Sequence, residues 1–64
     1  ERMVEKIALR QAISALPERE KTVIHLRYFH ALTQQRVAKL MNISQVQVSR
    51  IEKKAISLLR DLMG

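Results

Sequence analysis

Cysteine is absent from this 64-residue sequence, and glycine and proline occur once each. Without cysteine the chain can form neither disulfide bonds nor thiolate metal sites. The two histidines, His25 and His30, are five positions apart, which does not place both on one helix face. We therefore expect both at the surface, and no metal site. With so little glycine and proline in a chain that is 47% hydrophobic, the composition favours a nearly all-helical fold.

Acidic residues are also few, six against twelve lysines and arginines, and the formal net charge is +6. This balance favours a polyanionic partner, with nucleic acid ahead of an anionic membrane surface. The carboxylates are scattered, so capping and ion pairing explain them better than acid–base chemistry, and there is no glycine-rich phosphate loop. We expect neither enzymatic activity nor a cofactor. No apolar run approaches the ~20 residues of a membrane span and no signal peptide is visible, so we expect no membrane partner and a cytoplasmic location.

Apolar residues at helical spacing predict four helices, over residues 2–15, 17–29, 33–41 and 44–63. Pro17 separates the first two, because the residue before proline avoids the α region and proline suits a first helical turn. In the second helix we interpret Tyr28 and Phe29 as core rather than base-stacking residues. Residues 1–64 form one small domain with a thin core, since so short a chain buries only ~60% of its unfolded surface. The start at Glu1 rather than methionine suggests a piece of a longer protein.

The third predicted helix and its connection to the fourth have the caps and the turn of a helix-turn-helix. Thr33 is a good N-cap for the first of these helices. Asn42 stands where that helix must end in a left-handed residue, a conformation that asparagine tolerates. Ile43 can plug the corner, and Ser44 can cap the next helix. The second helix of such a motif enters the major groove of DNA.

The last predicted helix has two faces of different character. At about 100° per residue, an inward stripe contains Val48, Ile51, Ala55, Leu58 and Leu62. The outward face has amides, hydroxyls and cations but no carboxylate: Gln45, Val46, Ser49, Arg50, Lys53, Ser57 and Arg60. Glutamine and arginine can read base edges, valine can contact a thymine methyl, and the cations can meet phosphates. Taken alone, this helix could as well present an ordinary solvated face. The capped helix and the turn that precede it favour the interpretation as a DNA-binding face.

Two features of the last helix lie outside this division. Glu52 lies near the edge of the outward face, and we expect it to hold a neighbouring arginine or lysine rather than touch DNA. Ile56, Leu59 and Met63 form a second apolar row. Either the first helix covers this row, which we favour, or the row is a protein-docking groove.

Two segments, LPEREKTVIHLRYF and LTQQRVAKLMNISQVQVSRIEKKAISLLR, closely resemble the C-terminal region 4 of sigma-70 family sigma factors. The block ISQVQVSRIEKKAI is most similar to the sporulation and general-stress branch, especially the forespore sigma factors. The resemblance runs from about residue 16 to residue 60. It implies that the second helix of the motif binds the −35 element of promoter DNA and that the domain docks on the β flap of RNA polymerase.

The resemblance also implies roles for individual residues. It places base reading on Gln45, Val46, Ser49 and Arg50. It places contact with the DNA backbone on Thr33, Gln34 and Lys54, and extends it to Arg19 and Arg27. Lys53 is a further backbone contact by its place on the outward face. Arg36 stands where many members have an acidic residue, and we propose it as an accessory phosphate contact. Asn42 replaces a frequent glycine but can adopt the same backbone shape.

Housekeeping members have charged residues where this chain has Gln45, Val46 and Ser49, so we expect a different promoter preference. Two alternatives remain open. The first is the helix-turn-helix output domain of a response regulator. The second is a pure protein-interaction module, held by an anti-sigma factor or by the polymerase flap. An anti-sigma protein is a possible partner under the sigma-factor interpretation as well, on the second helix or at Ile56, Leu59 and Met63.

Overall fold

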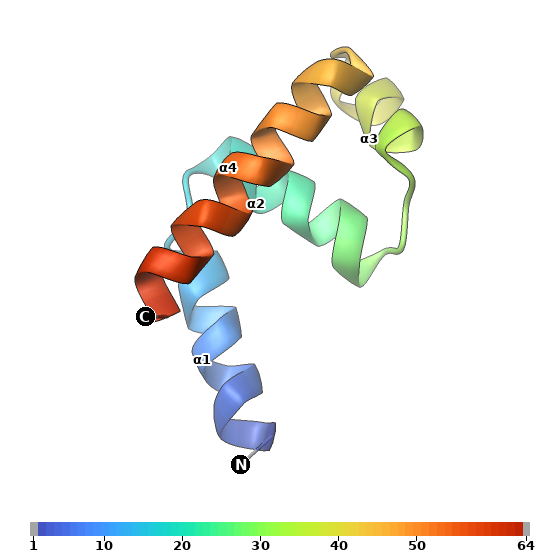
Figure 1. Ribbon diagram of the computed structural model, residues 1–64. Coiled ribbons are helices and arrows are strands. Elements are labelled where there is room, and N and C mark those ends of the chain that lie inside the picture. The colour runs from blue at the N-terminus through green and yellow to red at the C-terminus, as the bar shows by residue number, and fades with distance from the viewer. Residues whose placement is uncertain (1, 64) are drawn as a thin grey trace.

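The computed structural model describes the backbone of residues 2–63 and the side chains of residues 8–63. This part of the chain forms four α-helices and no strand: α1 (Arg2–Ser14), α2 (Glu18–Ile24), α3 (Gln34–Met41) and α4 (Gln45–Met63). A π-helical segment, η1 (His25–Phe29), continues α2. α4 is the longest helix and packs against α1, α2 and α3 (Figure 1). The all-α fold and the four predicted helices are confirmed. None of the described helices is long and apolar enough to cross a membrane.

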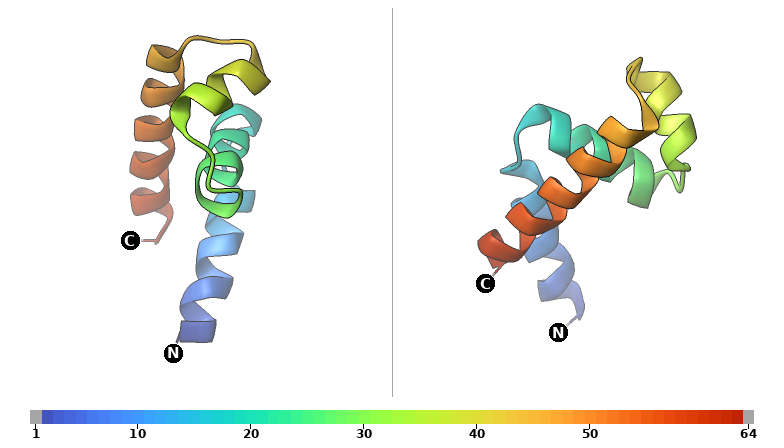
Figure 2. Two further views of the ribbon diagram at one scale, coloured as in Figure 1. Left: turned by 90° about the vertical axis from the view of Figure 1, so that its right-hand side faces the viewer. Right: turned by 45° about the horizontal axis from the view of Figure 1, so that its top comes forward.

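The core is divided into two clusters along α4. α3 and its turn into α4 form one end of the molecule, and the start of α1 and the end of α4 lie toward the other (Figure 2). The cluster at the first end contains Val23, Val37, Ala38, Val48 and Ile51. The second cluster contains Ile13, Leu16, Ile24 and Ala55. α4 contributes to both clusters, so one rigid helix sets the position of α3 relative to α1.

The predicted helix that spans residues 17–29 is not uniform. Pro17 is its N-cap residue rather than its first helical residue, and the α-helical part ends at Ile24. In the π-helical part, the His30 N–H donates to the His25 carbonyl over 3.1 Å, five residues back. The chain then closes with a bond of 3.0 Å from the Leu32 N–H to the Leu26 carbonyl. The extra residue in this turn allows Arg27 and Tyr28, adjacent in the sequence, to reach the same carboxylate on α4.

Three apolar side chains that the sequence predicts to be buried are half-exposed instead. Tyr28 and Phe29 are 55% and 49% exposed, because the wide turn of η1 places them at the surface. Leu62 is 54% exposed. It lies with Met63 beside Ala8, Gln11 and Ala12 of α1 and Ala15 just after it, and the small alanine side chains do not reach far enough to cover it. The rest of the inward stripe is confirmed, with Leu58 partly buried.

Candidate nucleic-acid interface

The corner between α3 and α4 is built from backbone bonds and caps that are local in the sequence. The Thr33 hydroxyl oxygen accepts from the Arg36 N–H over 3.1 Å, which confirms the predicted N-cap. Asn42 has φ 58° and ψ 46°, the left-handed conformation predicted for it. The Asn42 N–H donates to the Lys39 carbonyl and the Ile43 N–H to the Ala38 carbonyl, the pair of bonds that defines a Schellman motif.

α4 begins with a reciprocal cap. The Ser44 hydroxyl oxygen accepts from the Gln47 N–H over 3.1 Å, and the Gln47 side-chain oxygen accepts from the Ser44 N–H over 2.9 Å. Ser44 was predicted from its type and position. Gln47, three residues later, completes a capping box whose pattern is visible in the sequence and which our prediction missed. Ile43 packs against the first core cluster, as predicted, and closes the corner.

The predicted base-reading residues lie at the outer side of the first turns of α4. Gln45, Val46 and Arg50 are exposed, and Val46 is 61% exposed although it is apolar. Ser49 is half-buried at the edge of this face. An exposed valine beside an amide and a guanidinium is costly in water and suits contact with a thymine methyl in the major groove.

Three predicted contact residues meet where α3 approaches α4. Thr33, Arg36 and Gln45 line a shallow surface hollow together with Gln35, Ala38 and Lys39. The hollow lies at the N-terminus of α3, whose dipole and backbone N–H groups favour an anion. Arg36, in the first turn of α3, is repelled by the positive end of that helix, and a bound phosphate would relieve this repulsion. Lys39, in the last turn of α3, adds a second cation to the hollow.

The remaining predicted backbone contacts are arranged differently from one another. Lys53 is exposed on the outward face of α4. The Lys54 ammonium lies 3.9 Å from a carboxylate oxygen of buried Glu20, so Lys54 is on the side of α4 that faces α2. Arg19 is exposed on α2. Arg27 and Gln34 direct their side chains inward, to Glu52, rather than to the surface.

Glu52 is buried, not at the edge of the outward face, and this corrects the prediction of its place. Its Oε1 accepts from Arg27 Nε over 2.9 Å and from Gln34 Nε2 over 2.9 Å, and its Oε2 accepts from the Tyr28 hydroxyl over 2.8 Å. The predicted ion pair with an arginine is therefore present, but the arginine lies on η1. Burial by itself would raise the pKa of the Glu52 carboxyl, and the three hydrogen bonds outweigh it and lower that pKa.

The burial of Glu52 changes the charge of the whole surface. Between residues 21 and 60, Glu52 is the single acidic residue. Because it is buried and paired with Arg27, the exposed surface formed by residues 21–60 presents cations and no carboxylate. Such a surface fits the phosphate backbone of a nucleic acid.

A second surface lies farther along α4. Leu9, Ile13, Ile24, Tyr28, Phe29, Ile56 and Leu59 line an apolar hollow between α1, η1 and α4. Two of the three predicted docking residues, Ile56 and Leu59, contribute to it while packing partly against the second core cluster. Met63 does not, because it lies beside α1 with Leu62. The sequence prediction did not assign Leu9, Tyr28 and Phe29 to a docking surface. The aromatic pair Tyr28 and Phe29, at the end of a predicted helix, was the one signal in the sequence that could have indicated it.

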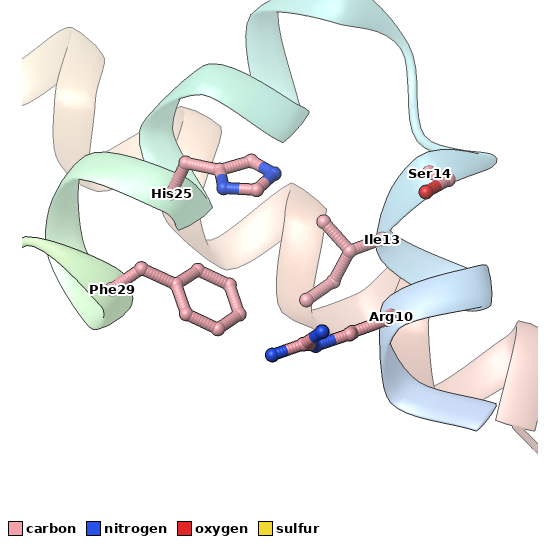
Figure 3. Close-up of a pocket in the computed structure, with 5 residues that line it drawn as sticks. All are labelled: Arg10, Ile13, Ser14, His25 and Phe29. Carbon is pink, nitrogen blue, oxygen red and sulfur yellow. The ribbon is translucent and has the colours of Figure 1, made fainter. Parts of the chain in front are cut away.

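A second pocket of similar size adjoins the apolar hollow and shares Ile13 and Phe29 with it. Figure 3 shows His25 and Phe29 on η1 facing Arg10, Ile13 and Ser14 on α1. The ring centroids of His25 and Phe29 are 5.0 Å apart. The Arg10 side chain extends toward the Phe29 ring, so a cation borders one side of the apolar surface (Figure 3). His25 and His30 are both exposed, as predicted.

Comparisons with known proteins show what this chain is similar to. Residues 12–61 match the family described as Sigma-70, region 4. The RNA polymerase sigma-F factor of Bacillus subtilis is 52% identical over 60 residues, which cover 94% of this chain and 24% of that protein. The sigma factor SigF of Mycobacterium tuberculosis is 49% identical and the sigma-G factor of B. subtilis 45% identical, each over 83% of this chain and 20% of the relative. The chain thus spans a quarter or less of the length of these relatives.

Proposed function

This chain belongs to the sigma-70 region 4 family, and from that premise we propose that it recognises promoter DNA as part of an alternative RNA polymerase sigma factor. Its relatives are sigma factors of the sporulation and general-stress branch. In this proposal α4 enters the major groove of the −35 element. The observation that carries it is the outward face of the first half of α4, which is exposed, free of carboxylates because Glu52 is buried, and adjacent to the N-terminus of α3.

The proposed contacts divide into two kinds. Gln45, Val46, Ser49 and Arg50 read bases, with Ser49 contributing from the edge of the face. Phosphates are held at the α3 N-terminus by Thr33, by the backbone of Gln34 and by Arg36, and along α4 by Lys53 and Lys54. Arg27 is not among these contacts, because Glu52 and the Leu32 carbonyl engage its guanidinium.

We propose that the apolar hollow is the surface that docks on the β flap of RNA polymerase. Tyr28 and Phe29 support this, since two half-exposed aromatic rings beside aliphatic side chains are the usual composition of a protein-binding patch. Ile56 and Leu59 form its floor on α4, and Met63 is left out. An anti-sigma protein that covered this hollow would compete with the polymerase.

The family match favours the sigma-factor function over the response-regulator alternative, which would act as a dimer without polymerase. A selection on randomised duplexes, with the chain tethered to RNA polymerase core, tests the proposal. The parent chain should enrich one short motif, and Arg50→Ala should lose discrimination at one or two base pairs, by about 1–3 kcal/mol if its contact is bidentate.

Arg10→Ala is the matched control. It removes the same charge and side-chain type from an exposed position on α1, away from the helix-turn-helix. This control should enrich the same motif as the parent chain. If Arg50→Ala discriminated duplexes as well as Arg10→Ala does, α4 would not read bases through the proposed face.

A further inference from the structure

One carboxylate joins three segments of the helix-turn-helix. Glu52 on α4 receives hydrogen bonds from Arg27 and Tyr28 on η1 and from Gln34, the first residue of α3. The same Arg27 guanidinium donates through Nη1 to the Leu32 carbonyl over 2.8 Å, in the link between η1 and α3. The donors are 18 to 25 residues away from Glu52 in the sequence, so the network is entirely tertiary.

Stability alone is a weak reason for this arrangement. Removing two charges from water costs several kcal/mol, and replacing a buried ion pair by apolar residues is often neutral or stabilising. The first core cluster around Val48 and Ile51 already holds α4 against α3 by apolar contacts. Apolar contacts are tolerant of small rotations, whereas three bonds of 2.8 to 2.9 Å to one carboxylate have fixed directions.

The rotation of α4 about its own axis matters for base reading. A side-chain tip about 5–6 Å from the helix axis moves by about 2 Å when the helix turns by 20°. A displacement of that size breaks a bidentate base contact, which needs donor–acceptor distances near 2.9 Å. Glu52 is two residues after Arg50 and three after Ser49, so its bonds act close to the reading residues.

Given the proposed function, we infer that Glu52 is a positioning residue, which sets the rotation of α4 relative to α3 and so determines how sharply bases are discriminated. Glu52 itself does not touch DNA. Its bond to the Tyr28 hydroxyl also ties the position of α4 to a ring that lines the apolar hollow.

The test compares two double variants of the chain. Arg27→Met with Glu52→Met replaces the ion pair by unbranched apolar side chains of similar length. Lys21→Met with Glu18→Met makes a like replacement at the surface pair on α2, where Glu18 is exposed and Lys21 half-buried and the paired atoms are 3.9 Å apart. Each double variant removes one cation and one anion, so the net charge stays at +6 and non-specific attraction to DNA is matched.

Three quantities are measured for both variants: the thermal midpoint, the affinity ratio between the selected duplex and a scrambled duplex, and the orientation of α4 relative to α3 from residual dipolar couplings. The variant at Glu52 should lose about tenfold in the affinity ratio, the loss of one good base contact, with unchanged affinity for scrambled DNA. The couplings should report a rotated α4. The variant at Lys21 and Glu18 should match the parent chain in the affinity ratio and in the couplings.

An unchanged affinity ratio together with unchanged couplings would overturn the inference. If the variant at Glu52 does not fold, Glu52→Gln, which keeps the shape and removes the charge, is assayed with the same couplings and ratio. A parent chain that binds both duplexes equally would overturn the proposed function instead. In that case the couplings alone still decide whether Glu52 sets the orientation of α4.

Discussion

Ala31 occupies a backbone conformation that alanine rarely adopts, and this gives a sharp prediction about stability. Its φ is 54°, in the left-handed region, where the Cβ atom approaches the following carbonyl oxygen. The conformation is imposed from both sides. Before Ala31, the His30 N–H closes the last turn of η1, and after it the Leu32 N–H returns to the Leu26 carbonyl. Glycine at this position would keep both bonds without the steric penalty.

The magnitude follows from two opposing terms. Relief of the left-handed penalty contributes about 1–2 kcal/mol, and the greater freedom of glycine in the unfolded chain costs about 0.4–1 kcal/mol. Ala31→Gly should therefore stabilise the protein by about 1 kcal/mol, which raises the thermal midpoint of a domain of this size by about 4–8 °C. Urea unfolding followed by circular dichroism at the helix band measures the difference directly.

Two further substitutions by glycine provide the comparison. Ala8→Gly changes an exposed alanine inside α1 and should destabilise by about 0.5–1 kcal/mol, because no left-handed strain is relieved there. Asn42→Gly should change stability by less than Ala31→Gly, since asparagine already tolerates its φ of 58°. If Ala31→Gly were as destabilising as Ala8→Gly, the left-handed strain assigned to the link before α3 would be refuted.

Three other predictions follow from the charges and the exposed rings. The pKa of Glu52 in the folded protein lies below its unfolded value near 4.5. The stability that its network contributes is therefore present at neutral pH and is lost as the pH falls below 4.5 and through the folded pKa. Acid unfolding of the parent chain should therefore be steeper than that of the double methionine variant at Glu52. Phe29→Ala should weaken binding to polymerase core by about tenfold, as a contact residue of a docking patch does, whereas Leu40→Ala, at an exposed leucine on α3, should not. Lys53→Ala should weaken binding to all duplexes alike and reduce the salt dependence by about one ion, which a titration with potassium chloride measures.

The parts of the fold that the sequence predicts correctly are those set by neighbours along the chain. An N-cap acts over three residues, as at Thr33 and Ser44. The helix that ends at the left-handed Asn42 is closed by the bond from Asn42 N–H to Lys39, three positions back, and by that from Ile43 N–H to Ala38, five positions back. The apolar periodicity of α4 identifies its buried stripe up to Leu58 for the same reason. It fails at Leu62, where the outcome depends on the small side chains that α1 places opposite.

The parts that the sequence does not predict depend on contacts between distant segments. The amino-acid types in residues 25–29 suit an ordinary α-helix. The π-helical turn is explained by a distant contact, because it lets Arg27 and Tyr28 both donate to the carboxylate of Glu52 on α4. Tyr28 and Phe29 have the composition of core residues, and their exposure follows from that same turn. Gln34 was assigned to DNA by resemblance, and only the structure shows its amide bound to Glu52.

A carboxylate within a DNA-binding motif has to be kept from the phosphates, and the structure shows how this chain does so. Exposed on α4, Glu52 would repel the DNA backbone for which we propose Lys53 and Arg36 as contacts. Burial removes it from the surface but requires a counter-charge, and Arg27 supplies one at 2.9 Å, which in turn keeps Arg27 from DNA. Every other lysine, arginine, aspartate or glutamate between residues 21 and 60 is a cation, so the field at the surface of the motif has one sign. A residue that would oppose binding at the surface is thereby available inside the protein for the role that we propose, the orientation of the helix to which we assign base reading.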